Sequence, residues 1–229
     1  MKRAVFLDRD GTINCMVHKP EFGLVDSPSN PVEFDLLPGV GGAIRAINEM
    51  GFLAIVVSNQ PGIAKGRFAP PLLEAMTAKM HSGLAEAGAR LDAVYYCLHH
   101  PEAVIEMYRA RCDCRKPSPG LLKRASEEWQ IDLSRSYLIG AGITDVGAGQ
   151  AVGATTILLN SHKGYVYDEL ARQGVRPNCI VGSLAEAVEV IERFENGDGA
   201  GKPNGFAMRP MGAIGKPNFV EGERTYAIQ

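Results

Sequence analysis

The chain has 229 residues and a nearly balanced charge, with 24 lysines and arginines against 26 aspartates and glutamates, which leaves a formal net charge of −2. This balance argues against non-specific binding to nucleic acid or to an anionic membrane surface, because both require a basic excess. No apolar stretch approaches the ~18 residues of a membrane-spanning helix, and the start of the chain lacks the apolar core of a signal peptide. We therefore expect a cytoplasmic protein with no nucleic-acid or membrane partner.

Short apolar segments recur along the chain and predict the strands of a parallel sheet. Apolar runs without polar alternation are typical of strands that are buried on both faces. In chain order, these segments are residues 3–8, 52–58, 92–97, 136–140, 154–159 and 178–181.

Helical spacing of apolar residues lies between these segments. It predicts helices over 40–47, 72–84 and 121–129, and Ser183 followed by Glu186 has the spacing of a capping box that opens a last helix ending near residue 194. Strands that alternate with helices predict an α/β, Rossmann-like three-layer sandwich with a mainly parallel sheet. In such sheets ligands bind at the carboxyl ends of the strands. The residues at those ends are therefore the first candidates for a site: Asp8, Ser58, Cys97 and Gly140.

The composition changes near residue 195, which divides the chain into a domain over 1–194 and a tail over 195–229. The tail contains seven glycines and three prolines, and the sequence Gly-Lys-Pro-Asn occurs in it twice, a composition typical of a flexible segment. We nevertheless expect its apolar residues to dock on the body of the protein or on a second copy of the chain, which would allow self-association. These residues are Phe206, Met208, Ile214, Phe219 and Tyr226.

Two aspartates directly follow the first predicted strand, in the sequence Asp8-Arg9-Asp10-Gly11-Thr12. Carboxylates two residues apart at a strand end lie at one rim of the sheet, where their repulsion favours a divalent cation or a shared proton. Taken alone, such a motif is more often an Asp-Gly turn with solvated acids.

The wider context of this motif resembles the haloacid-dehalogenase-like phosphohydrolases. Asp8 to Thr12 matches their first motif, Ser58-Asn59 the second and Lys116 the third, in the family's order. The fourth motif is half present, because Ala141 stands where the family has a metal-binding carboxylate, while Asp145 remains four residues later.

A narrower resemblance covers most of residues 3–192. The segments 8–14, 58–64 and 112–117, together with Cys97-x-His99, are similar to the subfamily of D-glycero-D-manno-heptose 1,7-bisphosphate phosphatase and histidinol-phosphate phosphatase. This resemblance implies a fold without a large cap domain, in which loops close the site. It implies a small phosphorylated sugar as substrate, with removal of the C7 phosphate of the heptose bisphosphate, and histidinol phosphate as the alternative.

A metal-binding pattern lies in the segment 97–114. Cys97-x-His99 is followed by twelve residues and then by Cys112-x-Cys114, which together offer three thiolates and one imidazole. This is the ligand set of a closed tetrahedral zinc site without an open position for catalysis, and the alternative is a loop of reduced cysteines. His100 is the other available imidazole, but the subfamily pattern uses His99. A structural zinc ion would stiffen this loop and hold the residues after it at the mouth of the site.

The resemblance also implies a magnesium-dependent mechanism through an aspartyl phosphate. Asp8 would be the nucleophile, and Asp10 would protonate the leaving sugar oxygen and then deprotonate the water. Magnesium would be held by Asp8, by Asp10 through its backbone carbonyl, and by Asp145.

Further residues are expected to bind the substrate. Ser58, Asn59 and Lys116 would bind the phosphoryl group that is transferred, and Arg115 offers a planar fork for a second phosphate. Ser58 as a helix cap and Arg115 as a solvated charge are the alternatives. The loop that follows the second motif contains three more polar residues, which either line the pocket or are solvated: Gln60, Lys65 and Arg67.

Ala141 leaves three interpretations of the activity open. In the first, Asp145 compensates for the missing carboxylate and the protein is a slow phosphatase. In the second, hydrolysis is lost and a phosphosugar-binding pseudoenzyme remains. In the third, the alanine is a deliberate substitution. Loss of one anionic ligand weakens a magnesium site in each case. Because Asp8, Asp10, Ser58 and Lys116 are all present, the sequence favours a phosphatase scaffold.

Overall fold

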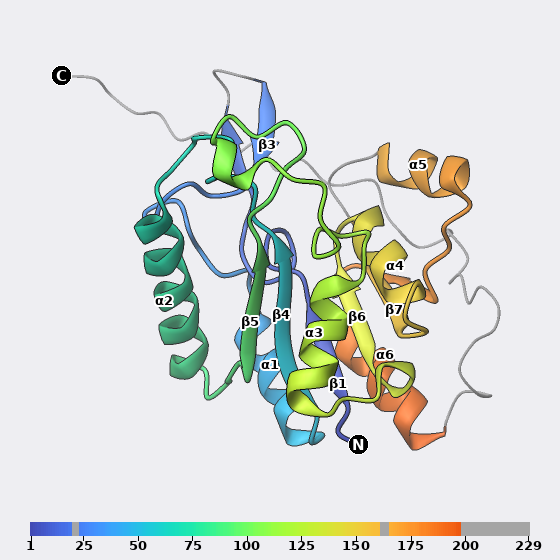
Figure 1. Cartoon of the computed structure of the whole chain (residues 1–229). Coiled ribbons are helices and arrows are strands. Elements are labelled where there is room, and N and C mark those ends of the chain that lie inside the picture. Colours follow the sequence, from blue (N-terminus) through green and yellow to red (C-terminus); the bar gives the residue numbers. More distant parts are fainter. Residues whose placement is uncertain (20–22, 161–164, 198–229) are drawn as a thin grey trace.

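The computed structural model of the chain describes residues 1–19, 23–160 and 165–197 (Figure 1). A six-stranded sheet forms the centre, in the order β5-β4-β1-β6-β7-β8, and all its neighbouring strands are parallel. The strands are β1 (Ala4–Leu7), β4 (Leu53–Asn59), β5 (Ala93–Cys97), β6 (Tyr137–Gly140), β7 (Thr155–Leu159) and β8 (Cys179–Val181). Each of them coincides with one of the predicted apolar segments.

Helices cover both faces of this sheet, so the predicted three-layer α/β sandwich is confirmed (Figure 1). One face carries α1 (Val40–Glu49), α2 (Pro70–Glu86) and α6 (Leu184–Asn196), and the other carries α3 (Gly120–Trp129) and α4 (Ile143–Gln150), with α5 (Tyr165–Gln173) packed beside α4. Successive residues of β1 point to opposite faces. Val5 and Leu7 therefore enter the core under α1 and α6, while Ala4 and Phe6 enter the core under α3.

Two strands and two helices of the described structure were not predicted from the sequence. A hairpin of β2 (Val17–Lys19) and β3 (Leu24–Asp26) rises from the loop after β1, and α4 and α5 follow β6 and β7. The 3-10 turns η2 (Glu106–Tyr108) and η3 (Leu133–Arg135) complete the described elements. No large cap domain is inserted in the described part of the chain. The hairpin, the segment 97–114 and α5 lie above the carboxyl ends of the strands (Figure 1).

The predicted cap of the last helix is present. Ser183 Oγ accepts a hydrogen bond of 3.2 Å from the Glu186 N–H, and the Glu186 carboxylate accepts one of 3.0 Å from the Gly182 N–H. The helix continues to Asn196, because Glu195 accepts a hydrogen bond from the Tyr137 hydroxyl at 2.8 Å and pairs with Arg3. The apolar tail residues from Phe206 onward lie outside the described residues.

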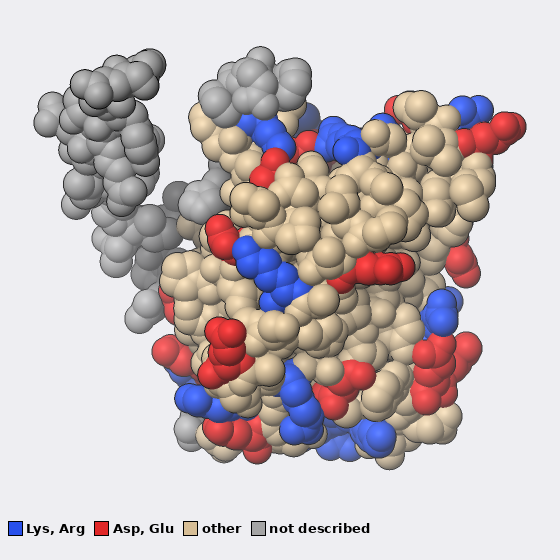
Figure 2. Space-filling model, turned by 90° about the vertical axis from the view of Figure 1, so that its left-hand side faces the viewer, with Lys and Arg blue, Asp and Glu red and all other residues tan. Residues whose placement is uncertain are grey.

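The surface agrees with the balanced composition. Figure 2 shows lysine and arginine side chains interspersed with aspartate and glutamate over one face of the molecule. Within the described ranges, no helix has the length and the apolar character needed to cross a bilayer.

The strand order determines which chain segments meet. Because β1 lies between β4 and β6, the residues at or just after the carboxyl ends of these three strands converge at one edge of the sheet. Asp8, Ser58 and Ala141 are thereby brought together from segments far apart in the sequence.

Candidate active site

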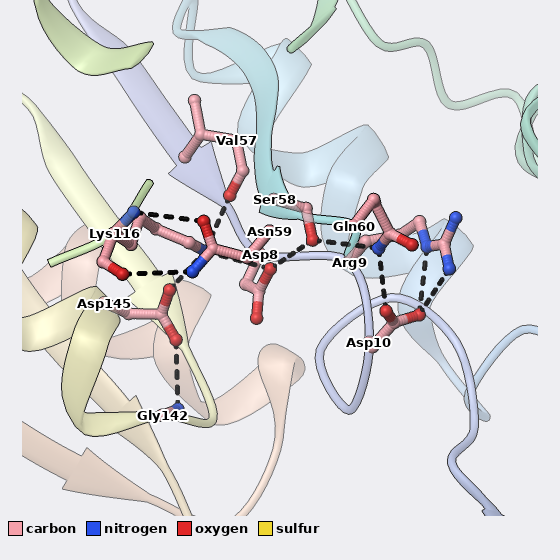
Figure 3. Close-up of polar contacts among 10 residues, drawn as sticks. All are labelled: Asp8, Arg9, Asp10, Val57, Ser58, Asn59, Gln60, Lys116, Gly142 and Asp145. Carbon is pink, nitrogen blue, oxygen red and sulfur yellow. Dashed lines mark hydrogen bonds and ion pairs between the residues drawn. The ribbon is translucent and has the colours of Figure 1, made fainter. Parts of the chain in front are cut away.

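Asp8 follows β1 directly and lies at the centre of the site (Figure 3). Its Oδ1 accepts a hydrogen bond of 2.6 Å from Ser58 Oγ and lies 2.9 Å from Lys116 Nζ. The side chain keeps 18 % of its surface exposed and lines the cavity in front of the sheet. Asp8 is therefore oriented by two fixed donors while part of its carboxylate stays accessible to a ligand.

Lys116 is the buried cation of this site, with 3 % of its surface exposed. Its Nζ donates 2.7 Å to the Val57 carbonyl and also pairs with Asp8 and Asp145. Burial alone lowers the pKa of an ammonium group, but the two carboxylates outweigh it and raise the pKa of Lys116. Lys116 is therefore a permanent ammonium group in contact with Asp8.

Asn59 holds the backbone of Lys116 in place. Its side-chain amide donates 3.1 Å to the Lys116 carbonyl and accepts 3.0 Å from the Lys116 N–H. Asn59 was predicted to bind the phosphoryl group, and it does line the cavity, but in this structure its amide is engaged in placing Lys116. Ser58 forms no helix cap here, because its hydroxyl points to Asp8.

Asp145 lies in the first turn of α4 and is 2 % exposed. One carboxylate oxygen pairs with Lys116, and Oδ2 accepts a hydrogen bond of 3.0 Å from the Gly142 N–H. Burial and the nearby Asp8 raise the pKa of Asp145 to about 6, although Lys116 and the Gly142 N–H act in the opposite direction. Both oxygens of Asp145 are thus engaged by protein donors, which makes it a support for Lys116 in this structure.

Asp10 has a separate set of partners (Figure 3). Arg9 donates to its Oδ1 from Nε at 2.9 Å and from Nη2 at 2.8 Å, while Gln60 Nε2 donates to Oδ2 at 2.7 Å. Gln60 is buried, so it is neither a pocket-lining residue nor part of a solvated loop. Arg9 was not singled out from the sequence, because an arginine between two acids reads as a solvated charge. Arg67 pairs instead with Asp26 of the hairpin.

A cavity of about 550 Å³ opens in front of these residues. Asp8, Asp10, Ser58 and Asp145 line its polar part, and apolar residues such as Met16, Val25 and Leu37 line the rest. This volume lies in the range of small-molecule sites, about 300–1,000 Å³. The cavity can therefore hold a ligand of the size of a phosphorylated sugar.

The oxygen donors of the site fit a magnesium ion in kind but are few. Asp8 offers a carboxylate to the cavity, whereas both oxygens of Asp145 already have partners and Ala141 has no donor. Magnesium is commonly held by one or two carboxylates together with waters and substrate phosphate. The arrangement thus suits magnesium bound mainly through Asp8 and the substrate.

The four predicted zinc ligands lie together above the carboxyl end of β5. Their donor atoms all lie within 4.8 Å of one another, and the three sulfur atoms are 3.2–3.6 Å apart. His99 Nδ1 lies 3.4 Å from Cys114 Sγ. A tetrahedral zinc ion with bonds of about 2.3 Å to sulfur requires sulfur atoms about 3.8 Å apart, so a small expansion accommodates the metal. Cys97, His99, Cys112 and Cys114 therefore fit a structural zinc site.

The segment 97–114, called the zinc loop below, is also attached to the neighbouring loop after β4. The backbone N–H groups of Val104 and Ile105 donate 2.9 and 3.0 Å to the Ala64 carbonyl in the loop after β4. Arg115, next to the last ligand, donates 3.3 Å to the His99 carbonyl. A zinc ion at this position would therefore hold the chain immediately before Lys116.

Comparison with known proteins agrees with this geometry. Residues 113–187 match the family model described as "HAD-hyrolase-like". The chain is 40 % identical to the D-glycero-beta-D-manno-heptose-1,7-bisphosphate 7-phosphatase of Yersinia pestis over 190 residues, which cover 82 % of this chain and 95 % of that protein. The corresponding enzyme of Escherichia coli K12 is 42 % identical over 156 residues, 68 % of this chain and 78 % of that protein. This chain belongs to the D-glycero-D-manno-heptose-1,7-bisphosphate 7-phosphatase family.

A solved structure of this phosphatase family has the same fold. The D,D-heptose 1,7-bisphosphate phosphatase from B. bronchiseptica, complexed with magnesium and phosphate, superposes with a TM-score of 0.69. It is 29 % identical, and the match covers 84 % of this chain and 99 % of that chain. The predicted haloacid-dehalogenase-like phosphatase is therefore confirmed, and the magnesium bound to that relative agrees with the magnesium dependence expected here.

We expect the purified phosphatase to contain one zinc ion per chain and Cys112→Ser to lose it on dialysis. A serine hydroxyl is a much weaker ligand for zinc than a thiolate, and the remaining three donors no longer close the tetrahedron. Elemental analysis of both proteins measures this. Cys15→Ser, which changes a cysteine outside the cluster, is the control and keeps its zinc. A zinc-free native protein, or full occupancy in Cys112→Ser, would contradict the assignment.

We also expect Asp145 to make stability depend on pH between about 4 and 6. The folded pKa of about 6 lies above the ordinary value of 3.8, so the folded state binds this proton more readily than the unfolded state. This contribution to stability is complete below pH about 4 and is lost as the pH rises through about 6. Thermal unfolding of the native protein and Asp145→Asn, without added magnesium, measures it. The variant should show a flatter profile, and identical pH profiles would count against the shift.

Proposed function

We propose that this chain hydrolyses the C7 phosphate ester of D-glycero-D-manno-heptose 1,7-bisphosphate through a phosphorylated Asp8. The observation that carries the proposal is the placement of Asp8, whose carboxylate is held by Ser58 and Lys116 and still opens on the cavity. Family membership supports the substrate, since the relatives of known activity carry that name.

The first half of the reaction transfers the phosphoryl group to the protein. A carboxylate oxygen of Asp8 forms a bond to phosphorus while the bond between phosphorus and the sugar oxygen breaks, and Asp10 gives its proton to that oxygen. Lys116 and the Ser58 hydroxyl offset the negative charge that gathers on the phosphoryl oxygens. Magnesium, when bound beside Asp8, reduces the repulsion between the carboxylate and the phosphate dianion.

The second half restores the carboxylate. Water attacks the phosphorus atom of the aspartyl phosphate, Asp10 accepts a proton from that water, and the bond from phosphorus to Asp8 breaks. Inorganic phosphate leaves, and both aspartates return to their starting state. Splitting the hydrolysis in this way replaces one difficult step by two easier ones.

A second phosphate needs its own cation at the rim of the cavity. Arg115 is partly exposed, comes directly before Lys116 in the chain, and donates a hydrogen bond from its guanidinium group to the His99 carbonyl. Lys65 is exposed and lies near the zinc loop. The pKa of His100 is lowered first by burial of its imidazole and then by the positive charges of Lys65 and Arg115. These cations support a bisphosphate as the substrate.

Ala141 is the feature that limits this proposal. A Cβ placed on Gly11 would lie 3.4 Å from Ala141 Cβ, so a side chain at position 141 faces the loop of the catalytic aspartates. An aspartate there would add a second carboxylate beside Asp8. We therefore propose that the native chain binds magnesium weakly and turns over slowly.

Ala141→Asp should lower the magnesium concentration needed for half-maximal phosphate release by about tenfold or more, since it adds an anionic ligand to a hard cation. Magnesium titrations of phosphate release from the heptose bisphosphate measure this for the native chain and the variant. Ala141→Asn, similar in size but neutral, is the matched control, and Asp8→Asn should abolish turnover.

The three possible results of this titration separate the functions. Turnover by both proteins supports a working phosphatase, and turnover by Ala141→Asp alone supports a scaffold that now only binds phosphosugars. No turnover by either protein would overturn the substrate assignment.

Arg115→Ala should raise KM for the bisphosphate by about 10-fold or more, because a charge-assisted bidentate contact is lost. It should leave KM for a substrate with a single phosphate, such as histidinol phosphate, within about twofold. Arg111→Ala, an exposed arginine of the same loop, is the control, and zinc content is checked in each protein. Equal losses on both substrates would contradict a role in binding the second phosphate.

A further inference from the structure

Arg9 is an unusual residue because its guanidinium group is completely buried. It is 0 % exposed although it lies between two aspartates at the edge of the site. Its charged group lies 5.6 Å from the ring centroid of Phe34 and 5.7 Å from that of Tyr96. Removing an arginine from water is costly unless it is paired. The partner is Asp10, which receives both Nε and Nη2 of the guanidinium fork on one oxygen.

Gln60 occupies the other oxygen of Asp10. Its Nε2 donates 2.7 Å to Asp10 Oδ2 and 3.2 Å to Ser58 Oγ, and the side chain is 2 % exposed. A carboxylate only accepts hydrogen bonds, so the amide nitrogen of Gln60, and not its oxygen, must face Asp10. All three contacts from Arg9 and Gln60 therefore come from donors, and together they fix both oxygens of Asp10.

The two aspartates of the site are thus neutralised separately. Asp8 has the ammonium group of Lys116 and the Ser58 hydroxyl, whereas Asp10 has Arg9 and Gln60. Figure 3 shows Asp10 on the far side of Gln60 and Ser58 from the group formed by Asp8, Lys116 and Asp145. Asp8 and Asp10 therefore contact different cations, although Asp8 shares Lys116 with Asp145.

We propose that Arg9 and Gln60 are positioning residues that hold the Asp10 carboxylate in one orientation, apart from Asp8, for its work as the acid and base of the reaction. This inference rests on the proposed function. Arg9 is kept rigid by Phe34 and Tyr96, and Gln60 by its second contact to Ser58. A misplaced acid–base group costs much of its contribution, which is about 10²–10⁴-fold in rate.

Gln60→Met is the variant that tests this role, since methionine has a similar length and packs in buried sites without offering a donor. We expect kcat to fall by about 10–100-fold while KM for the bisphosphate stays within about threefold. Gln150→Met is the matched control, because Gln150 Nε2 donates to the Arg176 carbonyl on the surface. It should leave kcat unchanged. Arg9→Lys, which keeps the buried charge but loses the fork, should also lower kcat.

A double-mutant cycle separates positioning from a general structural effect. In an Asp10→Ala background nothing remains for Gln60 to position, so adding Gln60→Met should change the residual kcat by less than about twofold. The cycle is measured in the native chain and again in Ala141→Asp. Equal losses from Gln60→Met with and without Asp10 would overturn the proposal.

A crystal structure of Gln60→Met gives a readout that does not depend on activity. We expect the Asp10 carboxylate to leave the orientation seen here, and an unchanged Asp10 would overturn the proposal. If neither the native chain nor Ala141→Asp releases phosphate, the proposed function fails. The orientation of Asp10 in this crystal structure still decides whether Gln60 holds it.

Discussion

The buried ammonium group of Lys116 is the interaction on which the active site depends. It lies between the carboxylates of Asp8 and Asp145, and Asn59 holds its backbone from the neighbouring strand end. Lys116 alone would be an expensive buried charge, and the two carboxylates offset that cost. Several groups must converge on Lys116 because a buried cation is costly without partners. A cation fixed at the sheet edge can attract a phosphate dianion and stabilise the negative charge that develops during phosphoryl transfer.

The zinc-binding segment 97–114 connects the carboxyl end of β5 to the chain just before Lys116. Four ligands gathered within 4.8 Å tie the end of β5 to the chain just before Lys116. A loop of this length with few buried apolar residues has little else to order it. A zinc ion there would therefore have a positioning role. Val25 of the hairpin lines the cavity, and the described part of the chain contains no large cap domain.

Ala141 separates two functions that phosphatases of this type combine at the edge of the sheet. The residues proposed to bind and orient a phosphoryl group, Ser58 and Lys116, both contact Asp8. Attraction of magnesium rests on carboxylates beside Asp8, and here one of them is missing while Asp145 is occupied by Lys116 and the Gly142 N–H. Under the proposed function, the chain therefore keeps the groups expected to bind the phosphoryl group and lacks one carboxylate expected to bind magnesium.

The strands could be predicted from the sequence because buried strands have continuous apolar runs, and the zinc ligands because these residue types occur at a characteristic spacing. The catalytic roles of Asp8 and Asp10 stay predictions. It did not reveal α4, α5 or the hairpin, whose apolar patterns are too short or too irregular to distinguish from loops. Only the tertiary structure decided which partner each charged residue takes. Asp145 pairs with Lys116, and Asn59 holds the Lys116 backbone. Arg9 and Gln60 both donate hydrogen bonds to Asp10. Most of these contacts join segments about 30 to 60 residues apart in the sequence, and the contact between Arg9 and Asp10 depends on burial of the arginine. A local sequence pattern encodes neither which distant segments meet nor whether a single polar residue is buried.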